Sequence, residues 1–295
     1  MLAWFAQRGR AHLPWRTDRS PYRVLVSEFM LQQTQVDRVV PAFERFIARF
    51  PSFEALAEAS QADVIRAWRG LGYNSRALRL HKLARAVCAD HGGSLPRDEA
   101  ALRALPGIGA YTARAVLAFA FDADVVAFDV NVRRIVHRTA LGFEHPPRAN
   151  ERELDALAQA AVPAGAGFAF NSALMDLGAT ICGARAAKCL VCPLREECAA
   201  APLDPVALAA GTRARKSAGG PQQRLPFEAT TRYVRGRVLD ELRGLGPGEA
   251  ISLLDLETRL APLLGAHAPG AVARAIEALH RDGLIATTAG IRLSD

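Results

Sequence analysis

The sequence predicts an all-α fold followed by a small additional domain, and three observations lead to this prediction. From about residue 22 to 127, apolar residues recur at helical spacing, and Pro and Gly residues divide the run into short helices. No convincing alternation of apolar and polar residues marks a strand in this region. Composition changes near residue 202, where a segment rich in Pro, Ala, Gly and Gln begins, as is typical of a linker.

The bulk composition points to an intracellular protein with a polyanionic partner. Hydrophobic residues make up 50% of the 295 residues, which is enough for a sizeable core. Lys and Arg number 37 against 30 Asp and Glu, a net charge of +7 that suits nucleic acid. No apolar run approaches the length of about 18 residues that a membrane helix needs. The first five residues lack the pattern of a signal peptide, so we expect a cytoplasmic location.

The first distinctive stretch is Leu13-Pro14-Trp15-Arg16, which follows a short amphipathic segment. Pro14 indicates a turn. Trp15 and Arg16 together offer a ring that can stack on a nucleic-acid base and a guanidinium that can hydrogen-bond it. The alternative is a Trp that fills a core.

Residues 25–36 are predicted to form a helix that packs into a core, because Leu25, Phe29 and Val36 fall on one helical stripe. Glu28 lies inside this apolar run, where an ionised side chain is costly to bury. Such a carboxyl tends to have a raised pKa, which suits a general acid near neutral pH. The alternative is an ordinary, partly exposed Glu on an amphipathic helix.

Residues 105–113 predict a helix, a tight turn and a second helix, with Gly107, Ile108 and Gly109 in the turn. Glycine lets the backbone approach a ligand closely, and the N–H groups at the start of the second helix suit a phosphate. A Gly-x-Gly pair alone is a weak signal. The sequence Leu-Pro-Gly-Ile-Gly with helical flanks is a stronger one, and it indicates a helix–hairpin–helix that binds the DNA backbone.

A second carboxylate, Asp129, lies in the apolar run of residues 125–134, two residues before Asn131. Asp129 can simply cap the helix that follows, and this alternative is compatible with a catalytic role. Glu28 and Asp129 would form a carboxylate pair, which is the arrangement used to cleave glycosidic bonds.

Four of the five cysteines are spaced C-x6-C-x2-C-x5-C near residue 190. Four thiolates in so short a segment can ligate either an iron–sulfur cluster or a zinc ion, and the spacing alone leaves both open. The fifth, Cys88, falls on a predicted helix and is expected to be an apolar core residue. The predicted metal ligands are Cys182, Cys189, Cys192 and Cys198.

After the predicted linker at 202–227, residues 228–295 predict three helices and a short strand pair, which is the pattern of a winged helix. The helices are expected near 233–242, 253–264 and 271–282, and the strands flank Ala289-Gly290. Winged helices bind DNA or dock partner proteins, and both alternatives stay open here.

Taken together, these motifs resemble the helix–hairpin–helix DNA glycosylases of the endonuclease III superfamily, and within it the MutY-type adenine glycosylases. The resemblance covers residues 1–201. It implies a two-lobed all-α fold, with a helical barrel at 22–127 that carries the hairpin. The second lobe, at 1–21 and 128–201, would hold a [4Fe-4S] cluster, which favours iron over zinc. The motifs are LPWR at 13–16, SEFMLQQTQV at 27–36, GLGY at 70–73, LPGIGAYTA at 105–113, FDVNV at 128–132, and the four cysteines.

The resemblance also implies roles for individual residues. Glu28 would protonate the departing base and then act as base for water, while Asp129 would stabilise the sugar cation or trap it covalently. Asn131 and Tyr111 would support these two carboxylates, and Gln33 would wedge into the duplex. Three residues would line the base pocket: Trp15, Arg16 and Asp176. The full set expected at DNA is Trp15, Arg16, Gln32, Gln33, Asn74, Arg76, Gly107, Ile108, Gly109 and Asp176.

Two positions and one segment separate this chain from the groups it resembles most. Bifunctional endonuclease III-type enzymes carry a Lys where this chain has Tyr111, so the resemblance implies a monofunctional glycosylase. The second Tyr that usually follows G-L-G-Y in MutY-type enzymes is here Asn74. The winged-helix-like segment replaces the usual C-terminal domain that reads 8-oxoguanine, as in some short actinobacterial-type homologues.

The sequence therefore predicts a base-excision repair enzyme that removes adenine opposite 8-oxoguanine or guanine. Its partner would be double-stranded DNA containing a mispaired or oxidised base, and we expect a monomer that does not bind membranes. One alternative is a thymine or uracil mismatch glycosylase, although Gln32 and Gln33 favour the MutY type. A second alternative is a non-catalytic iron–sulfur DNA-binding regulator, which the presence of both Glu28 and Asp129 argues against.

Overall fold

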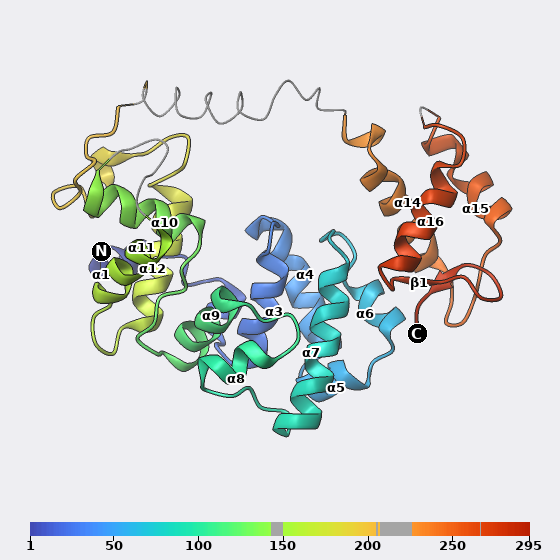
Figure 1. Ribbon diagram of the computed structural model, residues 1–295, viewed down its shortest axis with the longest axis horizontal. Coiled ribbons are helices and arrows are strands. Elements are labelled where there is room, and N and C mark those ends of the chain that lie inside the picture. The colour runs from blue at the N-terminus through green and yellow to red at the C-terminus, as the bar shows by residue number, and fades with distance from the viewer. Residues whose placement is uncertain (143–149, 205, 207–225, 266) are drawn as a thin grey trace. The chain divides into compact units, whose positions relative to one another are not determined.

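The structure is a computed structural model that describes residues 1–142, 150–204, 206, 226–265 and 267–295 (Figure 1). These residues are mostly helical, which confirms the predicted all-α fold. They divide into two compact units: Met1–Glu28 with Pro96–Ala104 and Ile108–Gln222, and Phe29–Leu95 with Leu105–Gly107 and Gln223–Asp295. None of the described helices is long and apolar enough to cross a membrane.

In chain order, the described α-helices are α1 (Leu2–Arg8), α2 (Pro14–Thr17), α3 (Pro21–Leu31), α4 (Val36–Arg49), α5 (Phe53–Glu58), α6 (Gln61–Ala67), α7 (Ser75–His91), α8 (Glu99–Ala104), α9 (Ala110–Phe121), α10 (Val130–Val136), α11 (Glu151–Ala160), α12 (Gly167–Thr180), α14 (Thr231–Gly244), α15 (Leu253–Leu260) and α16 (Ala271–Arg281). Short helices of other types are η1 (His137–Leu141), η2 (Cys189–Val191), η3 (Phe227–Ala229) and η4 (Ala261–Leu263). Two strands, β1 (Ile285–Ala286) and β2 (Arg292–Leu293), pair antiparallel.

The first unit has a core in which α10, α11 and α12 pack together, and residues of α1 lie against it. Val132 and Ile135 of α10 and Leu177 of α12 are at most 1% exposed. The helices approach closely at Gly178, where an added Cβ would lie 2.9 Å from the Cβ of Asn131. Glycine at this position of α12 therefore lets α10 place Asn131 against it.

The second unit begins at Phe29 near the end of α3 and continues with α4 to α7, and its core includes Phe43, Phe46 and Trp68. Pro51 separates α4 from α5, as the sequence predicts, but Pro41 lies inside α4 rather than ending it. A proline at this position removes one backbone hydrogen bond early in the helix. The helix continues through it because the buried face that carries Phe43 and Phe46 extends past the proline.

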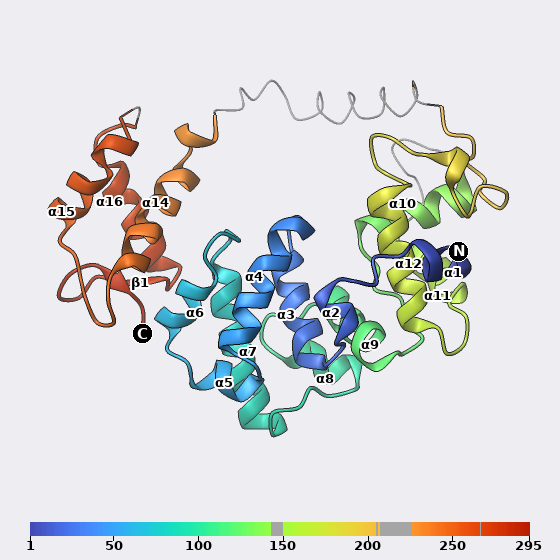
Figure 2. The ribbon, with the colours of Figure 1, turned by 180° about the vertical axis from the view of Figure 1, so that it is seen from behind.

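Residues 226–295 of the second unit form the three helices and strand pair expected from the sequence, with Ile285 opposite Leu293. Helices α14 and α16 lie side by side in both views (Figures 1 and 2). This segment shares its core with α6, because Ala62 and Ile65 belong to the same buried cluster. It is therefore packed against the preceding helices rather than free-standing. Most of the predicted linker at 202–227 lies outside the described residues.

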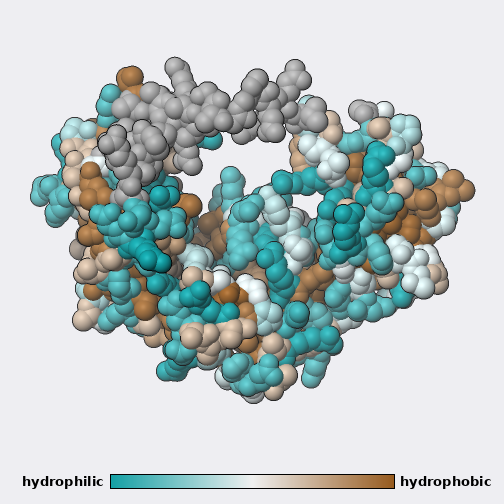
Figure 3. Space-filling model, in the orientation of Figure 1, coloured by the Kyte–Doolittle hydropathy of each residue, from teal (hydrophilic) through white to brown (hydrophobic). Residues whose placement is uncertain are grey.

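Figure 3 shows one face of the molecule. On this face many hydrophilic side chains are interspersed with hydrophobic ones, in a chain with 37 Lys and Arg and 30 Asp and Glu.

Candidate active site

Glu28 lies on α3 and is only 7% exposed, with Leu25 and Val26 beside it fully buried. Burial raises the pKa of this carboxyl to about 7. A hydrogen bond from Tyr111 opposes that shift, the charge of Asp129 adds to it, and Arg16 opposes it. The sequence predicts a raised pKa for Glu28, and the structure agrees. The carboxyl can exchange its proton near neutral pH.

Tyr111 sits in the first turn of α9, which begins directly after Gly109. Its hydroxyl donates to the carboxylate of Glu28. Burial, then the charges of Glu28 and Asp129, raise the pKa of Tyr111 well above its usual value. The side chain is therefore a neutral phenol. It can donate a hydrogen bond, but it cannot react as the amine of a Lys at this position would.

Asp129 caps the N-terminus of α10, so the capping alternative from the sequence is what the structure shows. Its Oδ1 accepts from the backbone N–H of Asn131 and of Val132, both at 2.8 Å, and its Oδ2 accepts from Asn131 Nδ2 at 2.7 Å. Three N–H donors fix the carboxylate in place. Asp129 also acts electrostatically on Glu28, so the structure brings the two predicted carboxylates together.

The hydrogen bonds that support Asp129 extend to Arg134, which lies outside the predicted site. Arg134 donates to Asn131 Oδ1 at 3.0 Å, to the carbonyl of Cys182 at 2.8 Å and to that of Gly178 at 2.9 Å. A continuous set of hydrogen bonds thus joins Asp129 to the start of the cysteine segment. The signal available in the sequence is the spacing of Arg134 and Arg138, which fall on one face of a helix.

Asp176 of α12 is 1% exposed and is held by two arginines. Arg16 NH1 and Arg10 NH2 lie 2.8 and 2.7 Å from its carboxylate oxygens, and the backbone N–H of Arg10 donates at 2.8 Å. Burial raises the pKa of Asp176, but these hydrogen bonds outweigh it, so the net shift is downward. The pair Arg16–Asp176 therefore holds a guanidinium near Glu28, whereas the neighbouring Trp15 is buried in the core. No sequence signal marks Arg10.

In the second unit, the turn between α3 and α4 presents Gln33, which is exposed and has a φ of 58°, while Gln32 is half-buried. Arg76 lies beneath this turn with 2% exposure. Its guanidinium donates to the carbonyls of Met30 and Gln32 at 2.9 and 2.6 Å and to that of Gly72 at 3.1 Å. A direct contact of Arg76 with DNA is no longer expected, because its donors are used inside the protein.

The remaining residues predicted to bind DNA lie in two turns. Gly107 has a φ of 85°, and it and Gly109 are exposed while Ile108 is buried, as a turn that offers its backbone N–H groups requires. Asn74 precedes α7, and its Oδ1 accepts a hydrogen bond from Arg243 at 2.8 Å. Contact of these residues with DNA stays a prediction.

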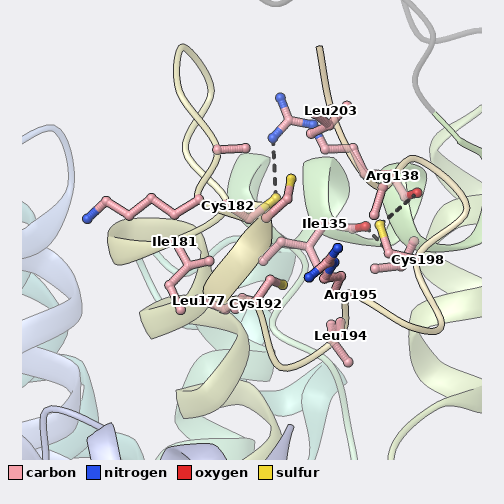
Figure 4. A pocket seen from close by; sticks show the side chains of 15 residues that line it. Ile135, Arg138, Leu177, Ile181, Cys182, Cys192, Leu194, Arg195, Cys198 and Leu203 are labelled. Carbon is pink, nitrogen blue, oxygen red and sulfur yellow. Dashed lines mark hydrogen bonds between the residues drawn. The ribbon is translucent and has the colours of Figure 1, made fainter. Parts of the chain in front are cut away.

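Cys182, Cys189, Cys192 and Cys198 line one cavity, together with apolar residues such as Ile135 and Leu194 (Figure 4). Burial raises the pKa of the Cys192 and Cys198 thiols, and the charges of the other cysteines add to this. Among the described residues, no group of three or more His, Cys, Asp or Glu is arranged to hold a single metal ion.

The donor set around this cavity fits an iron–sulfur cluster. Four thiols that line one cavity would ligate such a cluster as thiolates, because bound iron favours the loss of their protons. Arg138, in the π-helical turn η1, donates to Cys182 Sγ at 3.2 Å and to the carbonyl of Gly183 at 2.9 Å. Hydrogen bonds to ligand sulfurs are a common means of tuning such clusters. Cys88, on α7 of the other unit, does not line the cavity. It is half-buried, so it is not the buried core residue that the sequence predicts.

Comparison with known proteins shows the family to which this chain belongs. Residues 26–160 match the HhH-GPD superfamily of base excision DNA repair proteins. A thermostable thymine-DNA glycosylase is similar in structure, with a TM-score of 0.61 and 33% identity over 67% of this chain and 91% of that one. Endonuclease III in complex with DNA shares the fold, with a TM-score of 0.58 and 21% identity over 72% of this chain and 94% of that one.

Two curated relatives show to which family within this superfamily the chain belongs. Adenine DNA glycosylase of Mycolicibacterium smegmatis is 41% identical over 298 residues, which cover 100% of this chain and 94% of that protein. Adenine DNA glycosylase of Mus musculus is 40% identical over 210 residues, which cover 68% of this chain and 41% of that protein. The chain belongs to the adenine DNA glycosylase family, and the predicted resemblance is confirmed.

Proposed function

We propose that the protein hydrolyses the N-glycosidic bond of adenine opposite 8-oxoguanine or guanine in duplex DNA. The observation that carries the proposal is the buried carboxyl of Glu28, with a pKa of about 7, beside the firmly held carboxylate of Asp129. A relative aligned over the full chain and named adenine DNA glycosylase supports the choice of base. The target nucleotide would be flipped out of the duplex to reach these groups.

The two carboxyl groups then have distinct tasks. Glu28 gives its proton to the adenine, and the bond between the sugar and the base breaks as the base leaves. Asp129, ionised and held by three N–H donors, stabilises the positive charge on the sugar. Glu28, now ionised, accepts a proton from the water that attacks the sugar, which returns it to the acid form. Tyr111 stabilises the ionised form of Glu28 through its hydroxyl.

The general-acid role of Glu28 predicts a pH dependence. Because Glu28 must carry its proton, the rate of base release should fall as pH rises above about 7, approaching a tenfold loss per pH unit. Single-turnover release of adenine measured from about pH 6 to 9 reports this group in the bound complex. A rate that stays constant across this range would contradict the assignment.

Tyr111 predicts a monofunctional enzyme, because a phenol cannot form the Schiff base that cuts the strand. Product strands should stay intact until hot alkali cleaves them at the abasic site. Borohydride should trap no covalent adduct between protein and DNA. Prompt strand cleavage together with a trapped adduct would overturn this prediction.

We infer further that the four cysteines hold a [4Fe-4S] cluster, which would tie the cysteine segment to α10 and α12. The purified protein should be brown, with broad absorbance near about 400 nm. Cys192→Ser should lose this absorbance and its iron, whereas Cys88→Ser, the matched control, should keep both. A colourless protein with stoichiometric zinc would show that the cavity binds a different group.

A thymine or uracil mismatch glycosylase is the near alternative, since a thymine-DNA glycosylase is 33% identical over 67% of this chain. Duplexes that carry A, T or U opposite 8-oxoguanine or guanine separate the two functions directly. Release of adenine supports the proposal, and release of T or U alone contradicts it. A protein that binds these duplexes tightly and releases no base would instead be a DNA-binding regulator.

A further inference from the structure

The C-terminal segment, residues 226–295, is fastened to α6 and to the turn before α7 by specific hydrogen bonds. Arg243 of α14, whose side chain is 6% exposed, donates to the carbonyl of Ile65 at 3.1 Å and to Asn74 Oδ1 at 2.8 Å. Gln61 Nε2 donates to the carbonyl of Gly283 at 2.8 Å, and Arg66 to that of Leu245 at 3.2 Å. These bonds fix α14 relative to the Gly70–Asn74 loop.

At this junction an exposed arginine of α14 lies against the Gly70–Asn74 loop. The guanidinium of Arg232 lies 4.9 Å from the ring centroid of Tyr73, and both side chains are exposed, Tyr73 by 43%. The buried Arg76 approaches the same ring at 5.6 Å. A guanidinium held over a ring by a cation–π contact keeps the N–H donors of its own plane available, so Arg232 is positioned and still able to bind an anion.

The surroundings of Tyr73 carry further exposed arginines. Arg38 donates to the carbonyl of Gly70, Arg79 donates to that of Ser75 at 3.4 Å, and Arg69 has a side chain that is 68% exposed. Of these three arginines, Arg69 faces an acid of α14, because Asp240 lies 3.8 Å from it. Asp240 also lies 2.6 Å from Arg237 and 3.1 Å from Arg243. Arginines interleaved with an exposed aromatic ring form a surface suited to nucleic acid.

We propose that α14 and the Gly70–Asn74 loop form one DNA-binding surface, in which Arg232 of the C-terminal segment contacts a backbone phosphate. The inference depends on the proposed function only in that the partner is duplex DNA. It assigns the C-terminal segment to the substrate-binding surface through the N-terminal half of α14, and it gives Arg243 the task of positioning that helix against Asn74.

The test uses the full chain and an undamaged duplex, so that it does not depend on which base is excised. Arg232→Ala should weaken binding measured by fluorescence anisotropy and should lower the slope of log affinity against log salt by about 0.9, the value for one phosphate contact. Arg232→Lys should restore the slope, because the charge is retained. The matched control is Arg259→Ala on α15, an exposed arginine at 3.7 Å from Glu241, and it should behave as wild type.

Base release under saturating enzyme should match wild type in the control variant Arg259→Ala, because this side chain lies outside the proposed surface and Glu28 and Asp129 are untouched. Equal affinity and salt slope in Arg232→Ala and wild type would overturn the inference. The wild-type protein can also fail to release adenine from any duplex. If Arg232→Ala still lowers the salt slope in that case, this inference holds although the proposed function has failed.

Discussion

Glu28→Gln is expected to bind a mismatched duplex with near wild-type affinity and to release adenine at least about 10²-fold more slowly. The amide keeps the shape of the side chain and can still accept the hydrogen bond from Tyr111, but it has no proton to give. Affinity by anisotropy and single-turnover release of adenine measure the two effects separately. Glu44→Gln, on the exposed face of α4, is the control. Turnover within a few-fold of wild type would remove Glu28 from the mechanism.

The same substitution should stabilise the protein above neutral pH. The folded carboxyl binds its proton more tightly than the unfolded one, since its pKa rises from 4.5 to about 7. Stability is therefore lost as pH rises from about 4.5 to about 7, by a total of about 3 kcal/mol, and stays lower above that range. Gln carries no charge and avoids this loss, so thermal melting at about pH 8 should shift upward. A lower Tm at that pH would contradict the pKa assigned to Glu28.

Asp129→Asn is expected to fold normally and to release adenine about 10²- to 10³-fold more slowly. Asn is also a good N-cap, so its Oδ1 can still accept from the N–H groups of Asn131 and Val132. The negative charge that would stabilise the sugar cation is lost. Base release and thermal melting measure the two properties separately.

This substitution should also move the pH profile. The charge of Asp129 raises the pKa of Glu28, so its removal should shift the basic limb of the rate profile to lower pH. Asp98→Asn is the matched control, because Asp98 Oδ1 caps α8 by accepting from Ala101 N–H at 2.8 Å. A fast Asp129→Asn enzyme with the wild-type pH profile would rule out the carboxylate pair.

Local signals in the sequence predict much of the candidate site. The burial of Glu28 follows from the apolar run around it, and the cap formed by Asp129 follows from Asn131 two residues on. The cavity lined by four cysteines follows from their spacing. Each of these features depends on residues within a few turns of one another, which is the range over which helical periodicity carries information.

The features that the sequence does not predict depend on residues far apart along the chain. Arg76 reads as a surface arginine, and its burial requires carbonyls of residues 30, 32 and 72 to meet in space. The pairing of Arg10 with Asp176 spans 166 positions. The sequence also does not predict that residues 226–295 pack on α6. Ile65 fits the pattern of an ordinary amphipathic helix whether or not another segment covers it.

The guanidinium of Arg76 has a consequence for how the second unit moves. It bonds the carbonyl of Gln32 on one side and those of Leu71 and Gly72 on the other, so the Gln33 turn and the Tyr73 loop share one anchor. A displacement of either turn is transmitted to the other, because separating them would leave buried N–H groups of Arg76 without hydrogen-bond acceptors. We therefore expect the two exposed turns to move together, so that a duplex in contact with Gln33 would also displace the ring of Tyr73.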